Sequence, residues 1–156
     1  MPEFAWFASR RAQRSGFRSQ RSAVLARRGM VCTSQPLASQ AGLEVLRAGG
    51  SAVDAAIAAL ATLAVAEPYN TGLGGDCFAL VWREPERQVV ALNGSGRAPR
   101  RLTLDALRAA GHTQMPLVGA WSVTVPGAPQ AWQDLHERFG KRPWASLFDA
   151  AVRYAE

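Results

Sequence analysis

The residues of this sequence that could carry out metal or acid–base chemistry are few and lie far apart. His112 follows a glycine that ends a predicted short helix, and His136 lies within a longer predicted helix. Neither has a second histidine or a carboxylate at the spacing of metal ligands, such as two side chains on neighbouring helical turns. The residues therefore predict surface or helix-capping roles for both histidines, and no metal site.

Two serines are candidate nucleophiles. Ser95 lies between two glycines in Asn93-Gly-Ser-Gly96, and Ser51 precedes a predicted helix. The sequence contains no Gly-x-Ser-x-Gly elbow, and no helix is predicted directly after Ser95. Because neither serine has a base nearby in the sequence, the residues alone predict no catalytic side chain in this segment.

The loop Gly72-Leu-Gly-Gly-Asp76 has the glycine content of a phosphate-binding loop. It lacks the following Gly-Lys-Ser/Thr, and it leads into a strand where phosphate and dinucleotide loops lead into a helix. The residues leave two interpretations open. One is a tight turn in which a glycine adopts a positive φ, and the other is a functional loop whose ligand they do not specify.

The two cysteines, Cys32 and Cys77, are too few for a disulfide framework. Both lie in apolar runs and lack metal-ligand spacing, so both are predicted to be buried, unreactive thiols.

Charge is concentrated at the start of the chain. Residues 1–31 contain seven arginines and a single acid, Glu3, whereas the remaining residues carry 11 charges of each sign. A nucleic-acid-binding folded surface is therefore not predicted. No apolar stretch follows the Ser9-Arg-Arg11 pair, as an export signal requires, and no apolar run is long enough to cross a membrane. We expect residues 1–28 to form a flexible basic leader and the protein to be cytoplasmic, with the periplasm as the alternative.

The elements that must position any site begin after this leader. A strand is predicted over residues 29–34, and a helix then starts at Pro36 and ends at Gly49-Gly50. Ser51 and Asp54 have capping-box spacing at the start of a second helix, which ends at Glu67-Pro68. Its many alanines indicate a helix packed inside a layer.

A β-hairpin is predicted next. Residues 77–83 are apolar on both faces, which favours a strand buried on both sides. Residues 88–93 follow after a short turn and must therefore pair antiparallel. The remaining predicted elements are a short helix starting at Thr103 or Asp105, a half-buried strand over 120–125, a helix after Pro129, and a last helix containing Trp144, Leu147 and Val152.

Helices interleaved with an antiparallel hairpin give an α+β layered fold. The chain stops at Glu156 without a helix-ending residue. We therefore expect the sequence to be a fragment, cut inside its final helix.

Several ordered motifs resemble the γ-glutamyltranspeptidase family. They are Gly29-Met-Val31, the run from Pro36 to Ile57, Glu67-Pro-Tyr-Asn-Thr-Gly-Leu-Gly-Gly-Asp76, Arg97-Ala-Pro99, Val123-Thr-Val-Pro-Gly127 and Leu135-His-Glu-Arg-Phe-Gly140. The resemblance extends from Gly29 to Glu156, so residues 29–156 are similar to the N-terminal part of the family's large subunit.

The resemblance implies a four-layer αββα N-terminal-nucleophile hydrolase fold, of which this chain is the first part. Family members are proenzymes (zymogens) that cleave themselves, by autoproteolysis, into a large and a small subunit. The new N-terminal Thr of the small subunit is the nucleophile, and its own amine is the base. Such an Ntn-hydrolase takes the γ-glutamyl group from glutathione or similar amides. It transfers the group to an amino acid, acting as an acyltransferase, or to water, acting as a hydrolase, and it needs no cofactor.

This segment lacks the nucleophile and should be inactive alone. Its expected partners are the small-molecule substrate, the rest of the large subunit and the small subunit, with no nucleic acid and no membrane.

One position departs from the family pattern. In typical members an arginine binds the substrate α-carboxylate where this sequence has Ser95. Arg97 lies two residues on, and in extended backbone the two positions share a face about 6.6 Å apart. Arg97 could replace the missing arginine, or it could pair with a surface carboxylate. Ser95 and Arg97 are therefore the candidate substrate-binding residues.

Three functions follow from these patterns. The first is a fragment of a γ-glutamyltransferase or glutathione hydrolase. The second is a cephalosporin-acylase-like amidohydrolase, because the departure at Ser95 resembles γ-glutamyltransferase-like members of the family. The third is a non-catalytic structural or binding descendant.

Overall fold

The computed structural model of the chain describes residues 22–156, so most of the predicted leader lies outside the described residues. Residues 22–33 are without regular structure. The elements are α2 (Pro36–Arg47), α3 (Ala52–Ala66), β1 (Cys77–Arg83), β2 (Gln88–Gly94), α4 (Leu104–Ala109), a 3₁₀ turn (Ala120–Ser122), α5 (Ala128–Phe139), a 3₁₀ helix (Trp144–Phe148) and α6 (Asp149–Ala155). Among residues 22–156, no helix combines the length and apolarity that crossing a bilayer requires.

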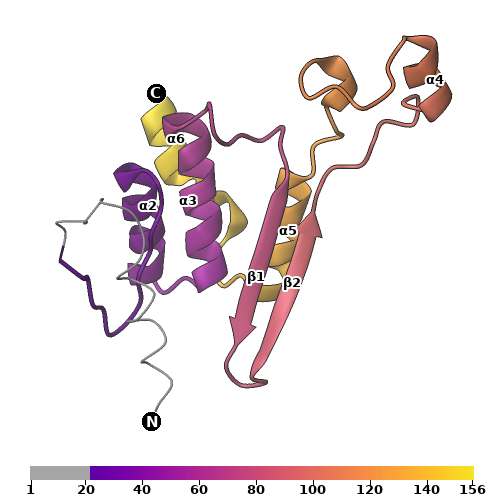
Figure 1. The fold of residues 1–156 in the computed structure, drawn as a ribbon. Coiled ribbons are helices and arrows are strands. Elements are labelled where there is room, and N and C mark those ends of the chain that lie inside the picture. The colour runs from indigo at the N-terminus through magenta and orange to yellow at the C-terminus, as the bar shows by residue number, and fades with distance from the viewer. Residues whose placement is uncertain (1–21) are drawn as a thin grey trace.

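Helix α3 is the centre of the helical part. It contacts α2, α5, α6 and the 3₁₀ helix at 144–148, while α5 also contacts both strands (Figure 1). Its alanine-rich sequence permits this, since small side chains allow neighbours to approach from several sides. Eight of its residues are buried, among them Ile57 and Thr62. The prediction of an internal helix is confirmed.

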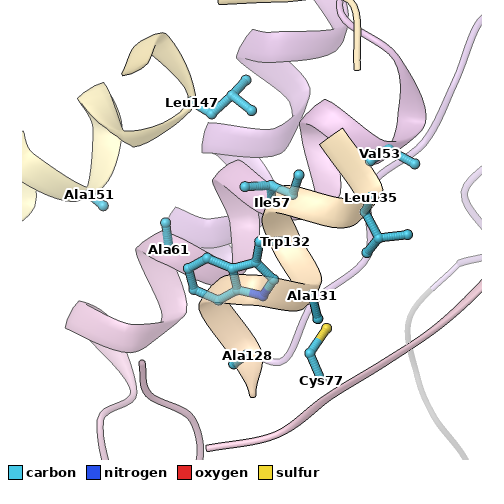
Figure 2. Close-up of a cluster of buried hydrophobic side chains, with 10 residues drawn as sticks. All are labelled: Val53, Ile57, Ala61, Cys77, Ala128, Ala131, Trp132, Leu135, Leu147 and Ala151. Carbon is cyan, nitrogen blue, oxygen red and sulfur yellow. The ribbon is translucent and has the colours of Figure 1, made fainter. Parts of the chain in front are cut away.

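The hydrophobic core joins α3 to α5. Trp132 of α5 is 3% exposed and lies among Ile57 and Ala61 of α3, Leu147 of the 3₁₀ helix and Cys77 of β1 (Figure 2). This one indole therefore connects the helical part to the start of the hairpin. Leu135 and Ala128, three and four residues away from it, lie on the same side of α5, and the neighbouring Ala131 completes the buried stripe.

The hairpin has the predicted antiparallel pairing. Its register places Cys77 opposite Gly94, Leu80 opposite Ala91 and Trp82 opposite Val89. Helix α5 covers one face of the pair, and α4 projects away from the rest of the molecule on the chain between β2 and α5 (Figure 1).

Two predicted strands are absent from the described residues. Residues 29–33 are irregular and lie along α2, where the side chain of Val31 approaches Gly42. Residues 120–122 form a 3₁₀ turn, in which the N–H and hydroxyl of Ser122 both donate to the carbonyl of Gly119. Both runs have strand-like sequences, but neither has a ladder partner among residues 22–156. A strand needs such a partner, because its backbone hydrogen bonds are made to a neighbouring strand and not within the strand itself.

Three further expectations need correction. The last helix is split into the 3₁₀ helix and α6. Cys77 is buried as predicted, but Cys32 is exposed because the segment around it is not a buried strand. The hairpin strand at 77–83 is buried on one face only, since Phe78, Leu80 and Trp82 remain exposed.

A buried carboxyl group connects the start of α3 to the segment after α5. Asp54 is completely buried, and its Oδ2 accepts hydrogen bonds from the N–H groups of Ser51 (2.8 Å), Lys141 (2.9 Å) and Arg142 (3.2 Å). The Ser51 hydroxyl accepts in turn from the Asp54 N–H, so the predicted capping box is confirmed. Nε2 of His136 lies 2.8 Å from the Arg142 carbonyl oxygen and 3.8 Å from Oδ1 of Asp54. His136 is thus a partly buried structural residue.

We predict that Asp54→Ala destabilises the chain strongly. The change removes a helix cap and leaves two further backbone N–H groups without an acceptor, so a loss of about 2–4 kcal/mol in the free energy of unfolding is expected. Urea denaturation followed by circular dichroism measures it. Asp134→Ala, at an exposed site on α5, is the matched control and should change stability by less than about 0.5 kcal/mol. Equal effects of the two substitutions would contradict the assignment.

We also predict that the chain on its own associates through the uncovered face of the hairpin. Phe78, Leu80, Trp82 and Val89 are each more than half exposed on that face, and apolar faces of this kind drive association. Light scattering should show oligomers, and Leu80→Lys should reduce them. Leu117→Lys, at a residue 97% exposed outside the hairpin, should leave them unchanged. A monomeric wild-type chain would refute the prediction.

Candidate functional site

The two candidate substrate-binding residues lie directly after β2. The strand ends at Gly94, and the N–H of Ser95 donates to Oδ1 of Asn93 (3.0 Å). Ser95 and Arg97 are exposed, whereas Gly96 between them is half-buried. This alternation is what an extended backbone with residues 95 and 97 on one face produces.

Two other segments hold this stretch from both sides. Oδ1 of Asp76 accepts a hydrogen bond from the N–H of Gly96 (2.8 Å), and the Thr124 hydroxyl lies 3.5 Å from the same oxygen. On the other side of Gly96, the N–H of Val125 donates to the carbonyl of Arg97 (2.9 Å). The segment that carries Ser95 and Arg97 is therefore fixed before and after its central glycine.

The same place receives the start of α5. The carbonyl of Gly75 accepts from the N–H groups of both Gly127 (3.1 Å) and Ala128 (3.0 Å). The first N–H groups of a helix have no partner within the helix, so the Gly75 carbonyl satisfies two donors that would otherwise remain free. We refer to this meeting of three segments as the junction; it comprises Gly75, Asp76, Gly96, Arg97, Thr124, Val125, Gly127 and Ala128.

Glycine is required where the backbones meet. A Cβ at Gly96 would lie 2.1 Å from the carbonyl oxygen of Val125, and a Cβ at Gly127 would lie 2.2 Å from that of Gly94. Both distances are far below van der Waals contact. In the loop at 72–76 no glycine has a positive φ, so the interpretation of this loop as a tight turn with a positive-φ glycine is wrong. A turn is nevertheless present, with the Gly75 N–H donating to the Gly72 carbonyl.

Two ionisable side chains near these segments have shifted pKa values. The Ser34 hydroxyl and the Asn70 amide donate to the Glu67 carboxylate, and these bonds lower the pKa of Glu67 below its ordinary value. Burial raises the pKa of the Cys77 thiol, opposed in part by the indole of Trp132. Glu67 thereby anchors the beginning of the loop that ends at Asp76, and Cys77 is a core residue.

The other residues considered from the sequence lie away from the junction. The imidazole of His112 packs edge-on against Trp121, and His136 contacts the Arg142 carbonyl. Within residues 22–156, no three His, Cys, Asp or Glu side chains gather closely enough to hold a metal ion. Sequence reasoning missed Asp76, although a carboxylate directly after Gly74-Gly75 was a signal that could have directed attention to it.

The segments that meet at the junction are those of the ordered motifs noted in the sequence. A family model described as Gamma-glutamyltranspeptidase matches residues 38–156. The chain belongs to the γ-glutamyltranspeptidase family. The family assignment made from the motifs is therefore confirmed.

Known relatives agree with this assignment. The chain is 40% identical over 134 residues to the Glutathione hydrolase-like YwrD proenzyme of Bacillus subtilis, covering 85% of this chain and 25% of that protein. Among solved structures, cephalosporin acylase from Bacillus halodurans is 51% identical with a TM-score of 0.82, over 92% of this chain and 26% of the other. Helicobacter pylori γ-glutamyltranspeptidase is 30% identical with a TM-score of 0.78, over 86% and 39%.

The likeness confirms the fold class. The chain forms part of the four-layer αββα N-terminal-nucleophile hydrolase fold. It spans about a quarter of the length of the first curated relatives that it matches.

We predict that Gly96→Ala disrupts the junction. The added methyl would overlap the Val125 carbonyl, so the three segments must separate, at an expected cost of about 1–3 kcal/mol in stability. Gly74→Ala is the matched control, because a Cβ there meets no atom within 4 Å. Thermal unfolding of the two variants measures the difference, and a Gly96→Ala protein as stable as Gly74→Ala would contradict the described packing.

Proposed function

We propose that this chain is the N-terminal part of the large subunit of an amide-cleaving enzyme that uses an acyl-enzyme intermediate. The observation that carries the proposal is that three of the six ordered motifs, those at 67–76, 97–99 and 123–127, meet at the segment bearing Ser95 and Arg97. The activity belongs to the full-length protein, because the nucleophilic Thr of the family pattern lies downstream of this segment. The partners are the rest of the large subunit and the small subunit that autocleavage releases.

We assign to the segment the recognition of the acyl donor. A γ-glutamyl donor such as glutathione presents an α-carboxylate, and the Arg97 guanidinium can bind a carboxylate through charge-assisted hydrogen bonds. Among residues 22–156, no carboxylate lies within ion-pair distance of Arg97, whereas Arg83 and Arg153 each have one. The proposed reaction transfers the γ-glutamyl group to the downstream Thr and then to water or an amino acid.

A cephalosporin-acylase-like activity is the second candidate. It is favoured by Ser95, which stands where typical family members have the carboxylate-binding arginine, and by the 51% identity to the acylase from Bacillus halodurans. In that case the donor amide need not present an α-carboxylate to this segment. The division into a leader and a family domain, and the cytoplasmic location, stay predictions from the sequence.

We predict that Arg97→Ala in the full-length protein lowers kcat/KM on γ-glutamyl donors by roughly 10–150-fold, the equivalent of one charge-assisted hydrogen bond. Autocleavage should be unaffected, because Arg97 acts on the donor. Ser95→Arg should raise activity on glutathione. Arg101→Ala, another exposed arginine nearby, is the control and should be neutral.

The two candidate functions give different results in this experiment. A kcat/KM within twofold of wild type for Arg97→Ala on every donor turned over contradicts the role of Arg97 in donor recognition. Turnover of a cephalosporin side-chain amide without turnover of glutathione would favour the acylase activity. Absence of autocleavage and of turnover in the wild-type protein would favour a non-catalytic descendant.

A further inference from the structure

Asp76 is an acidic side chain whose hydrogen bonds reach the segment bearing Ser95 and Arg97 and the Thr124 hydroxyl, and not its own loop. Its Oδ1 accepts from the N–H of Gly96, twenty residues further along the chain, at 2.8 Å. We propose that Asp76 is a positioning residue of the donor site, which holds Ser95 and Arg97 in the orientation that meets the acyl donor. This inference rests on the proposed function of that segment.

The geometry of Gly96 makes such a residue necessary. Only glycine fits there, because a Cβ would lie 2.1 Å from the Val125 carbonyl oxygen. Glycine also has the widest choice of φ and ψ of any residue, so the peptides on either side of it are the least restrained part of the segment. Ser95 and Arg97 are attached to those two peptides, and any rotation at Gly96 changes the angle between their side chains.

Two hydrogen bonds restrict this freedom, one at the Gly96 N–H and one at the Arg97 carbonyl. Because a peptide is planar, fixing the Gly96 N–H also fixes the plane that joins Ser95 to Gly96. Asp76 supplies this bond, and the Val125 N–H holds the peptide that follows Arg97 through the Arg97 carbonyl. The second bond is between backbone groups and tolerates many side chains. The first depends on the side chain at position 76, so a substitution at that position can release the peptide between Ser95 and Gly96.

An oxygen acceptor is what this role requires, and a full negative charge is not. A carboxylate forms the shorter and stronger bond, but the amide oxygen of asparagine can occupy the place of Oδ1. The positioning role therefore predicts that Asp76→Asn retains function and that Asp76→Ala loses it. A carboxylate that bound a cationic group of the donor directly would show the opposite for asparagine, since removing the charge would remove the contact.

The experiment compares Asp76→Ala, Asp76→Asn and wild type in the full-length protein, with Asp105→Ala as an exposed acidic control on α4. With any donor that the wild type turns over, Asp76→Ala should raise KM about tenfold and change kcat by less than about threefold, because donor binding is what the segment provides. Asp76→Asn should stay within about threefold of wild type. Adding Asp76→Ala to Arg97→Ala should cause little further loss, because the two residues act through one segment.

Hydrogen exchange at the Gly96 amide provides a readout that does not need activity. Asp76→Ala should increase its exchange rate, and Asp76→Asn and Asp105→Ala should not. Unchanged exchange and KM in Asp76→Ala would overturn the inference, as would an Asp76→Asn variant that loses donor binding as fully as Asp76→Ala. If the wild type turns over no amide donor, the proposed function fails, while faster exchange in Asp76→Ala alone would still support the positioning of the segment by Asp76.

Discussion

The close approach of backbones at Gly96 and Gly127 is the constraint on which the rest of the arrangement depends. Each glycine lies against a carbonyl oxygen of another segment at a distance that admits no side chain. This contact allows the Gly75 carbonyl to cap α5 while the end of β2 passes beside it. The start of α5 and the end of β2 are thus fixed by one set of contacts, and these contacts also determine where the exposed residues Ser95 and Arg97 lie.

Helix α5 transmits this arrangement to the rest of the molecule. Its first residues belong to the junction, and Trp132, one turn further on, fills the core beside Ile57 of α3. Beyond the end of α5, the N–H groups of Lys141 and Arg142 donate to the buried Asp54 at the start of α3. The helix is therefore held at both ends by polar contacts and in its middle by apolar ones. Displacement of α5 would affect the junction and the core together.

Local patterns predicted the fold well, and patterns that depend on distant partners did not. The capping box of Ser51 and Asp54 and the antiparallel hairpin were predicted, because their determinants lie within a few residues. The runs at 29–34 and 120–125 have strand-like composition, yet pairing is decided by segments elsewhere. The candidate site shows the same limit. Arg97 is a candidate through a family resemblance, whereas Asp76 acts on Gly96 twenty residues away, a contact that no local spacing encodes.

The composition of the strand Cys77–Arg83 predicts cover on both of its faces, whereas residues 22–156 cover only one of them. Its alternate residues are apolar on both faces, but α5 covers one face, and Phe78, Leu80 and Trp82 point away from that cover. A strand of this composition is stable in water only when both faces are covered. In the αββα fold two sheets stack between helical layers, so a strand of either sheet has a helix on one side and the other sheet on the opposite side. Helix α5 is therefore the helical cover of this hairpin, and the fold pattern assigns the face bearing Phe78, Leu80 and Trp82 to the other sheet. Since β2 leads directly from this hairpin into Ser95 and Arg97, the candidate segment is continuous with the strand pair, and the position of the hairpin determines where that segment begins.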